Sequence, residues 1–104
     1  TAENMFTTVI KCLSNFAEAW NKRATGRFLL ENDLGSVDDI IETIRIEPRH
    51  FCALSELGMI RFKAKDFLGT LQADKAAYLI NPHLPQTKKI IDKLEKIRRA
   101  CTLK

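Results

Sequence analysis

Cysteine and histidine are the residues of this sequence best suited to bind a metal ion or to pair a nucleophile with a base. The sequence contains five of them, mostly far apart: Cys12, Cys52, Cys101, His50 and His83. No Cys-x-x-Cys or paired-histidine spacing accompanies the short interval between His50 and Cys52, so we expect no metal site. An odd number of widely spaced cysteines also argues against a disulfide framework and favours a reducing compartment. We therefore interpret the cysteines as small buried apolar residues and the histidines as surface residues of turns.

Carboxylates gather near the start of one expected helix, at Asp38, Asp39 and Glu42. Acids in that place interact favourably with the positive end of the helix dipole, which explains such a cluster more often than acid–base catalysis does. The four glycines are scattered, so they do not form a phosphate-binding loop. We therefore predict a protein that is not an enzyme, with no catalytic residue, no metal ligand and no cofactor.

Basic residues gather near the carboxyl end. Residues 85–104 contain seven Lys and Arg against two acids, a net charge of +5, whereas residues 1–84 have a net charge of −1. A basic helix can bind phosphates. Here Asp92 and Glu95 interrupt the patch, and no aromatic residue lies nearby to stack on a base. We interpret this segment as a solvated capping helix, and binding of nucleic acid or an anionic surface is the alternative.

The elements that position these residues follow from an internal repeat. When residues 17–50 are laid over residues 51–84, a shift of 34, ten positions carry the same or similar residue types. The pairs are Trp20 with Leu54, Ala24 with Gly58, Arg27 with Arg61, Phe28 with Phe62, Asn32 with Asp66, Leu34 with Leu68, Gly35 with Gly69, Ser36 with Thr70, Ile46 with Ile80, and Pro48 with Pro82. A period of this length is typical of stacked helical repeats.

Each copy has the pattern of two helices. Apolar residues recur at three- and four-residue steps. Asn32 and Asp66 lie in mid-copy, where each can cap a second helix, and Pro48 and Pro82 end those helices. We predict no strand and six antiparallel helices, at residues 3–13, 17–30, 33–46, 51–64, 67–80 and 86–101. Trp20 should be largely buried in the core that they form.

The predicted fold class is therefore all-α, an antiparallel helix-pair solenoid that forms a single domain over residues 1–104. Residues 3–16 contain the second helix of a truncated repeat. Residues 17–50 and 51–84 are two full repeats, and residues 85–104 form the capping helix. The first helix lacks a partner, so apolar residues such as Phe6 and Val9 should be exposed. We expect upstream sequence or self-association through this end.

The repeated residues resemble the tetratricopeptide repeat (TPR), which has 34 residues. A tryptophan or leucine stands near its start, a small residue four positions later and a proline near its end. The resemblance rests on Trp20, Ala24, Pro48, Leu54, Leu57, Gly58, Ala77 and Pro82. The segments AEAWNKRAT, EPRHFCALSELG and NPHLP also look like small bacterial proteins of this family. Departures from the family pattern are Arg27 and Arg61 at aromatic or large apolar positions, Glu31 and Lys65 at a turn glycine, and Ser36 and Thr70 at an alanine.

The resemblance implies a scaffold for protein–protein interaction, in which a concave groove holds a peptide or a partner helix. The family's groove positions correspond here to Glu18, Asn21, Thr25, Phe28 and Leu29, to Cys52, Ser55, Met59, Phe62 and Lys63, and to Gln86, Lys89, Lys93 and Lys96. The family's clamp for the carboxylate tail of a chaperone is not matched, because Asn21 and Thr25 replace its donors and Glu56 adds negative charge. The apolar groove positions favour a ligand with a hydrophobic anchor. Lys89, Lys93 and Lys96 in the last predicted helix favour an acidic stretch in the same ligand.

Membrane and export signals are not evident in the sequence. No apolar run approaches the roughly 18–20 residues that cross a bilayer, and no signal peptide is visible. The sequence begins with Thr1, so a cleaved signal is compatible with it. The cysteines weakly favour the cytoplasm, and the periplasm is the alternative if a signal was removed.

Overall fold

The computed structural model describes residues 2–102, and the side chains of residues 3–100. Over that range the chain forms six helices and no strand. The helices are α1 (Ala2–Cys12), α2 (Ala17–Leu29), α3 (Asp33–Ile46), α4 (Phe51–Lys63), α5 (Phe67–Ile80) and α6 (Pro85–Thr102). Each observed end lies within one residue of the predicted one, so the all-helical fold class is confirmed. None of the described helices is long and apolar enough to cross a membrane.

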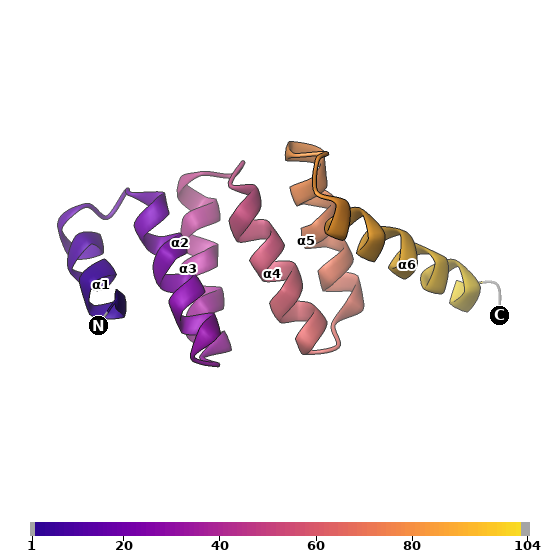
Figure 1. Ribbon diagram of the computed structural model, residues 1–104, viewed down its shortest axis with the longest axis horizontal. Coiled ribbons are helices and arrows are strands. Elements are labelled where there is room, and N and C mark those ends of the chain that lie inside the picture. Colours follow the sequence, from indigo (N-terminus) through magenta and orange to yellow (C-terminus); the bar gives the residue numbers. More distant parts are fainter. Residues whose placement is uncertain (1, 103–104) are drawn as a thin grey trace.

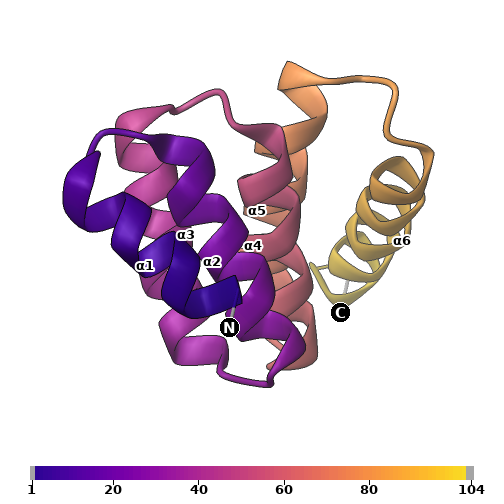
Figure 2. The ribbon, with the colours of Figure 1, turned by 60° about the vertical axis from the view of Figure 1, so that its left-hand side comes forward.

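The helices form a row in which each packs mainly on its neighbours in the chain. Packing is most extensive between α2 and α3 and between α4 and α5, while α1 and α6 extend the row at its two ends. In Figure 1, α2 and α4 lie in front and α3 and α5 lie behind them. The resulting body is elongated, with extents of 52 × 25 × 20 Å. Figure 2 shows α6 running obliquely beside α5 at the carboxyl end of the row.

The turn inside each repeat is built in the same way. Glu31 and Lys65 have left-handed backbone conformations, with φ of 61° and 63°, at the positions where a glycine is usual. The next residues, Asn32 and Asp66, cap α3 and α5, because their side-chain oxygens accept the backbone N–H three residues later at 3.1 Å and 3.0 Å. The predicted caps are therefore confirmed in both repeats.

A hydroxyl ties the two helices of each repeat together. Ser36 Oγ donates to the carbonyl oxygen of Ala24 at 2.8 Å, and the single hydroxyl proton of Thr70 is shared between the carbonyl oxygens of Gly58 at 3.3 Å and Asp66 at 3.0 Å. Ser36 and Thr70 are both buried. An alanine in either place could not make this bond, so the two departures from the TPR pattern satisfy buried polar groups.

The core lies between the two helix layers. Its centre consists of Ala24, Ile40, Ala53, Leu57, Ile60 and Ala73, with Phe28, Val37 and Ile44 packed against it. Trp20 is partly buried, between the core residues and the exposed surface. Its Nε1 reaches the carbonyl oxygen of Ser14 at 2.9 Å, and the guanidinium of Arg23 lies 5.2 Å from the ring centroid. The indole edge is thus held at the surface by polar contacts.

Asp39 has a different role from the one predicted. It is 1% exposed and accepts two hydrogen bonds from Arg23, at 2.9 Å and 2.7 Å. Arg27 lies 3.3 Å away on the same carboxylate. The hydrogen bond to Asp39 raises the pKa of Arg23. The acid therefore belongs to a buried ion-pair network between α2 and α3, and the helix-dipole interpretation is corrected at this residue.

The cysteines are also corrected. Cys12 and Cys52 are free and exposed, not buried. The side chain of Cys101 lies outside the described residues. His50 is more than a surface residue of a turn, because its Nδ1 accepts the backbone N–H of Ala53 at 3.2 Å and so caps α4.

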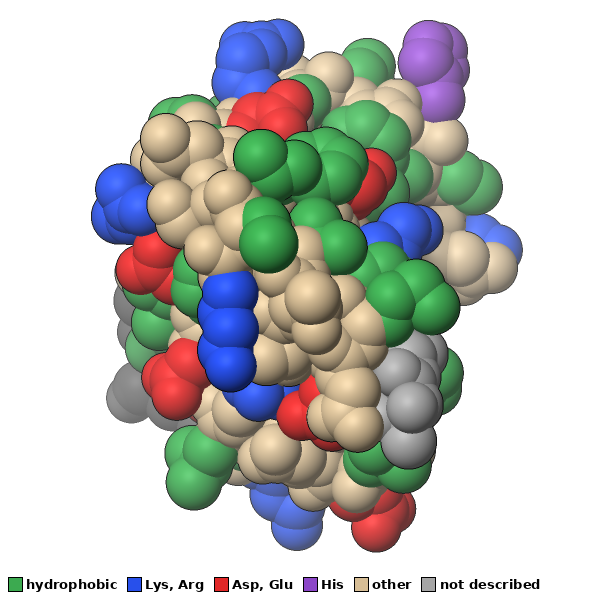
Figure 3. All heavy atoms as spheres, turned by 90° about the vertical axis from the view of Figure 1, so that its left-hand side faces the viewer, with side chains coloured by type: hydrophobic (Ala, Val, Ile, Leu, Met, Phe, Trp, Pro, Cys, Tyr) green, Lys and Arg blue, Asp and Glu red, His purple; other side chains and the backbone are tan. Residues whose placement is uncertain are grey.

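The α1 end of the row carries exposed apolar side chains, some of which Figure 3 shows among polar groups. Met5, Leu13 and Phe16 are the exposed ones. Phe6 and Val9, which were predicted to be exposed, are half-buried.

Candidate functional site

The facing sides of α2 and α4, where the predicted groove begins, are bound to each other. Thr25 Oγ1 donates to Glu56 Oε1, and Glu18 Oε1 lies 3.1 Å from Nε2 of His50. Burial raises the pKa of Glu56, and the hydrogen bond from Thr25 partly opposes that shift. Asn21 is buried, and its Oδ1 has no hydrogen-bond partner in the described part of the chain. These polar side chains hold the two repeats together at this point.

Farther along the same face, Lys63 connects the two repeats. Its Nζ lies 3.2 Å from Oδ2 of Asp33 and 5.8 Å from the centroid of the Phe28 ring. Phe28 is half-buried, whereas Leu29 at the end of α2 is largely exposed. The ammonium group of Lys63 is therefore already paired within the chain.

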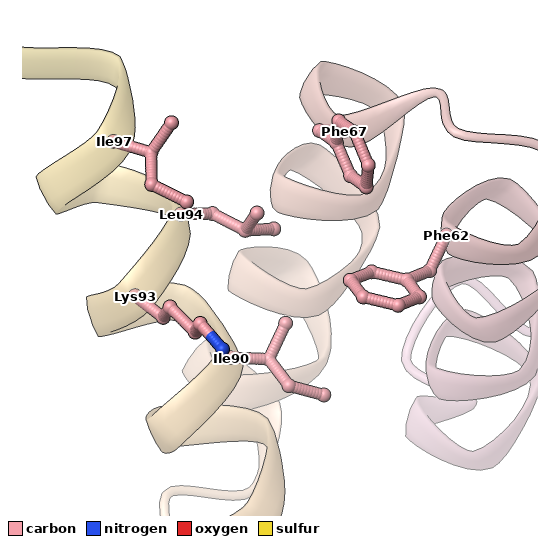
Figure 4. Close-up of a pocket in the computed structure, with 6 residues that line it drawn as sticks. All are labelled: Phe62, Phe67, Ile90, Lys93, Leu94 and Ile97. Atoms are coloured by element: carbon pink, nitrogen blue, oxygen red, sulfur yellow. The ribbon is translucent and has the colours of Figure 1, made fainter.

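The open part of the site is a hollow between α4, α5 and α6, made of two adjoining cavities that share Phe62 and Ile90. The first cavity has a volume of about 340 Å³. Phe62, Phe67, Ile90, Lys93, Leu94 and Ile97 line it. Figure 4 shows the two phenylalanines on one side and the α6 residues facing them across the cavity. The two rings meet edge to face, with centroids 5.5 Å apart. This arrangement gives an aromatic wall opposite an aliphatic one.

The second cavity has a volume of about 470 Å³ and is more polar. Ser55, Gly58, Met59, Phe62, Lys63, Thr70, Asp74, Gln86, Thr87 and Ile90 line it. Asp74 is 4% exposed, and burial raises the pKa of its carboxyl to about 6. The carboxylate lies on the backbone of Gly58, where an added Cβ would come within 2.1 Å of Asp74 Oδ1. Glycine is therefore required at position 58 while this carboxylate keeps its place.

The predicted groove residues are thus divided between two regions. The hollow brings together Ser55, Met59, Phe62, Lys63, Gln86 and Lys93. Glu18, Asn21, Thr25, Phe28 and Leu29 lie outside it on α2, and Cys52 lies outside it at the start of α4. Lys89 and Lys96 are exposed on α6 and do not line either cavity.

Sequence reasoning missed several residues that line the hollow. The missed residues are Gly58, Phe67, Thr70, Asp74, Thr87, Ile90, Leu94 and Ile97. A signal for one of them was present, because Asp74 stands 34 residues after Ile40, which is fully buried in the first repeat. An acid in place of a core isoleucine indicates a different local environment.

Metal-ligand side chains do not converge in the described part of the chain, where no three His, Cys, Asp or Glu form a group that could hold an ion. The mostly apolar lining of the hollow suits contact with an organic group, with Asp74 as a polar partner.

Comparison with known proteins finds a curated relative for part of this chain. No protein-family model matches this sequence. A TPR repeat-containing protein from Rhizobium etli is 42% identical over 59 residues. The aligned stretch covers 57% of this chain and 29% of the relative, so the chain spans less than a third of the relative's length. This similarity confirms the resemblance to TPR proteins that the repeated residues predicted.

Proposed function

We propose that this TPR-like chain is a scaffold for protein–protein interaction, and that it holds a peptide or a partner helix in the hollow between α4, α5 and α6. The observation that carries the proposal is the apolar lining of that hollow, which is open to solvent. Met59, Phe62, Phe67 and Ile97 are each about half exposed around it. A gathering of exposed apolar groups in a concave surface is typical of an interaction site.

The shape of the hollow favours a side-chain anchor. Phe62 and Phe67 form a rigid aromatic corner, and aromatic groups in a partly desolvated pocket supply much of the affinity at protein interfaces. A cavity of about 340 Å³ can accept one large apolar side chain of a ligand. The similarity to a TPR repeat-containing protein supports a protein-interaction scaffold in general terms. We infer a role without catalysis from the mostly apolar lining.

The ionic character of the ligand is a separate part of the proposal. Of the three lysines expected to select an acidic stretch, Lys93 lines the first cavity, whereas Lys89 and Lys96 lie on the exposed surface of α6. Lys63 lines the second cavity but is paired with Asp33. An acidic segment of the ligand would therefore run along α6 beside the hollow, close to Lys93.

Binding of phosphates through α6 is the second candidate function. Six basic side chains of this helix are exposed: Lys88, Lys89, Lys93, Lys96, Arg98 and Arg99. Glu95 reduces the local charge, because it pairs with both Lys75 and Arg98. A salt titration separates the two functions, since phosphate binding falls steeply with ionic strength and apolar anchoring does not.

The test of the proposed function is selection of peptides from a displayed random library on the immobilised protein. Peptides should be enriched for a large apolar residue, and Ile97→Asp should abolish their binding because it puts a charge in the first cavity. Leu79→Asp is the matched control, because Leu79 is also exposed on a helix but lies outside the hollow. Circular dichroism checks that both variants fold. Peptides that bind wild type and Ile97→Asp equally would refute the groove.

A further inference from the structure

The second cavity contains a buried acid, Asp74, that makes no hydrogen bond or ion pair with the described residues. Asp74 is 4% exposed, and burial is the only cause of its raised pKa, with no hydrogen bond or nearby charge among the described residues contributing. The other strongly buried acid is different. Asp39 is held by Arg23 through two hydrogen bonds. An isolated buried carboxylate is unfavourable unless a donor reaches it.

Packing alone does not require an acid at this position. Ile40 occupies the equivalent place in the first repeat and is fully buried beside Ala24. In the second repeat the carboxylate instead lies on Gly58 and faces the cavity. The acid thus stands where an apolar side chain would fill the core, and it is directed at the space that a ligand would enter. An ionisable group that lines a cavity and has a pKa perturbed by burial is a candidate for a binding site.

We propose that Asp74 is the acceptor for a lysine or arginine side chain of the bound peptide, and that the hollow selects a basic residue near an apolar anchor. This inference rests on the proposed function, because it assigns ligand chemistry to the same hollow. The peptide's cation would enter the second cavity and pair with Asp74, while its apolar side chain would fill the first.

Charge in the second cavity supports a cation over an anion. Lys63 is the one other charged side chain that lines it, and the Nζ of Lys63 is 3.2 Å from Asp33. The α6 residues of the lining, Gln86, Thr87 and Ile90, carry no charge. With a pKa of about 6, Asp74 is mostly ionised at neutral pH. A carboxylate in these surroundings forms its strongest hydrogen bonds with a charged donor.

The extent of the two cavities along α6 limits the distance between the basic residue and the apolar anchor of the peptide. From Thr87 in the second cavity to Ile97 in the first, α6 advances ten residues, which is about 15 Å at about 1.5 Å per residue. An extended peptide advances about 3.3 Å per residue. The basic residue and the apolar anchor should therefore be at most about four or five positions apart.

The experiment is a parallel selection from one displayed peptide library on wild type, Asp74→Asn and Asp38→Asn. Asp38 is an exposed acid on α3, so its variant is a matched control for the same chemical change. Wild type and Asp38→Asn should enrich peptides with Lys or Arg within about five positions of an apolar residue. Asp74→Asn should lose the enrichment of the basic residue.

A double-mutant cycle with one selected peptide then measures the contact. Replacing its basic residue by glutamine should weaken binding about tenfold or more on wild type and less than twofold on Asp74→Asn, as read by fluorescence anisotropy. The role of Asp74 would be overturned if the glutamine peptide lost the same affinity for both proteins, or if wild type selected apolar peptides without a basic residue. Neither result would contradict peptide binding in the hollow. If selection yields no peptide that Ile97→Asp rejects, the proposed function fails, and this inference fails with it.

Discussion

Replacing Asp74 by asparagine should stabilise the free protein at neutral pH and have little effect near pH 4. Burial raises the pKa of the carboxyl from 3.8 to about 6. A shift of about two units corresponds to about 3 kcal/mol, at about 1.4 kcal/mol per unit. The native state holds this proton more tightly than the unfolded chain, so the free energy of unfolding falls as pH rises from about 4 through about 6. Asparagine cannot ionise and avoids that loss. Its unpaired amide reduces the net gain to about 1–3 kcal/mol.

Urea denaturation followed by circular dichroism, at about pH 4 and about pH 7.5, measures this effect. The change in the free energy of unfolding between the two pH values is compared in the variant and in wild type. The difference isolates Asp74, because Glu56 and Glu95 titrate in both proteins. Asp39→Asn is the contrasting control. It should lower the free energy of unfolding at neutral pH by about 3 kcal/mol, because it weakens the buried pairing of Arg23. The reasoning would be refuted if the free energies of unfolding of Asp74→Asn and wild type differed by the same amount at both pH values. It would also be refuted if the variant were less stable than wild type at neutral pH.

Three further substitutions test other features. Trp20→Ala should lower the free energy of unfolding by about 2–4 kcal/mol, less than for a fully buried indole, and an unchanged thermal melt would show that the ring does not support the core. Lys65→Gly should raise that free energy by about 0.5–1 kcal/mol, because glycine relieves the left-handed backbone at φ of 63°, and a lower urea midpoint would contradict this. In a Cys12→Ser, Cys101→Ser background, Cys52 should react with a thiol reagent without denaturant. The reaction rate should keep increasing with pH at values above the ordinary thiol pKa, because partial burial raises the pKa of Cys52. A rate that reaches a plateau at neutral pH would contradict that shift.

The helices could be predicted from the sequence because local chemistry determines their ends. Asn32 and Asp66 cap within three residues of their own position, and Pro48 and Pro82 end the preceding helices without help from distant parts of the chain. Because the sequence repeats with a shift of 34 residues, the same signals predict the corresponding helices in both copies. Information of this kind is short in range, and a single sequence contains it.

The site could be predicted only in part, because it depends on contacts between distant residues. Thr25 and Glu56 are 31 residues apart, and their hydrogen bond occupies a stretch that the family's register would leave open for a ligand. The hollow depends on how α6 lies against α5, and no repeated pattern specifies that packing. Asp74 was visible as a mismatch with Ile40, but its unpaired state is evident only once its neighbours are placed.

Packing mainly between chain neighbours has a consequence for how the protein opens. Because α6 rests chiefly on α5, it can detach in a local fluctuation while α2 and α3 stay folded. Its backbone amides should then exchange with solvent faster than those of the central helices. The hollow exists only while α6 is docked, so a bound peptide that touches both α4 and α6 would slow that exchange. Undocking of α6 alone would remove one wall of the hollow and release the peptide, while the other helices stay folded.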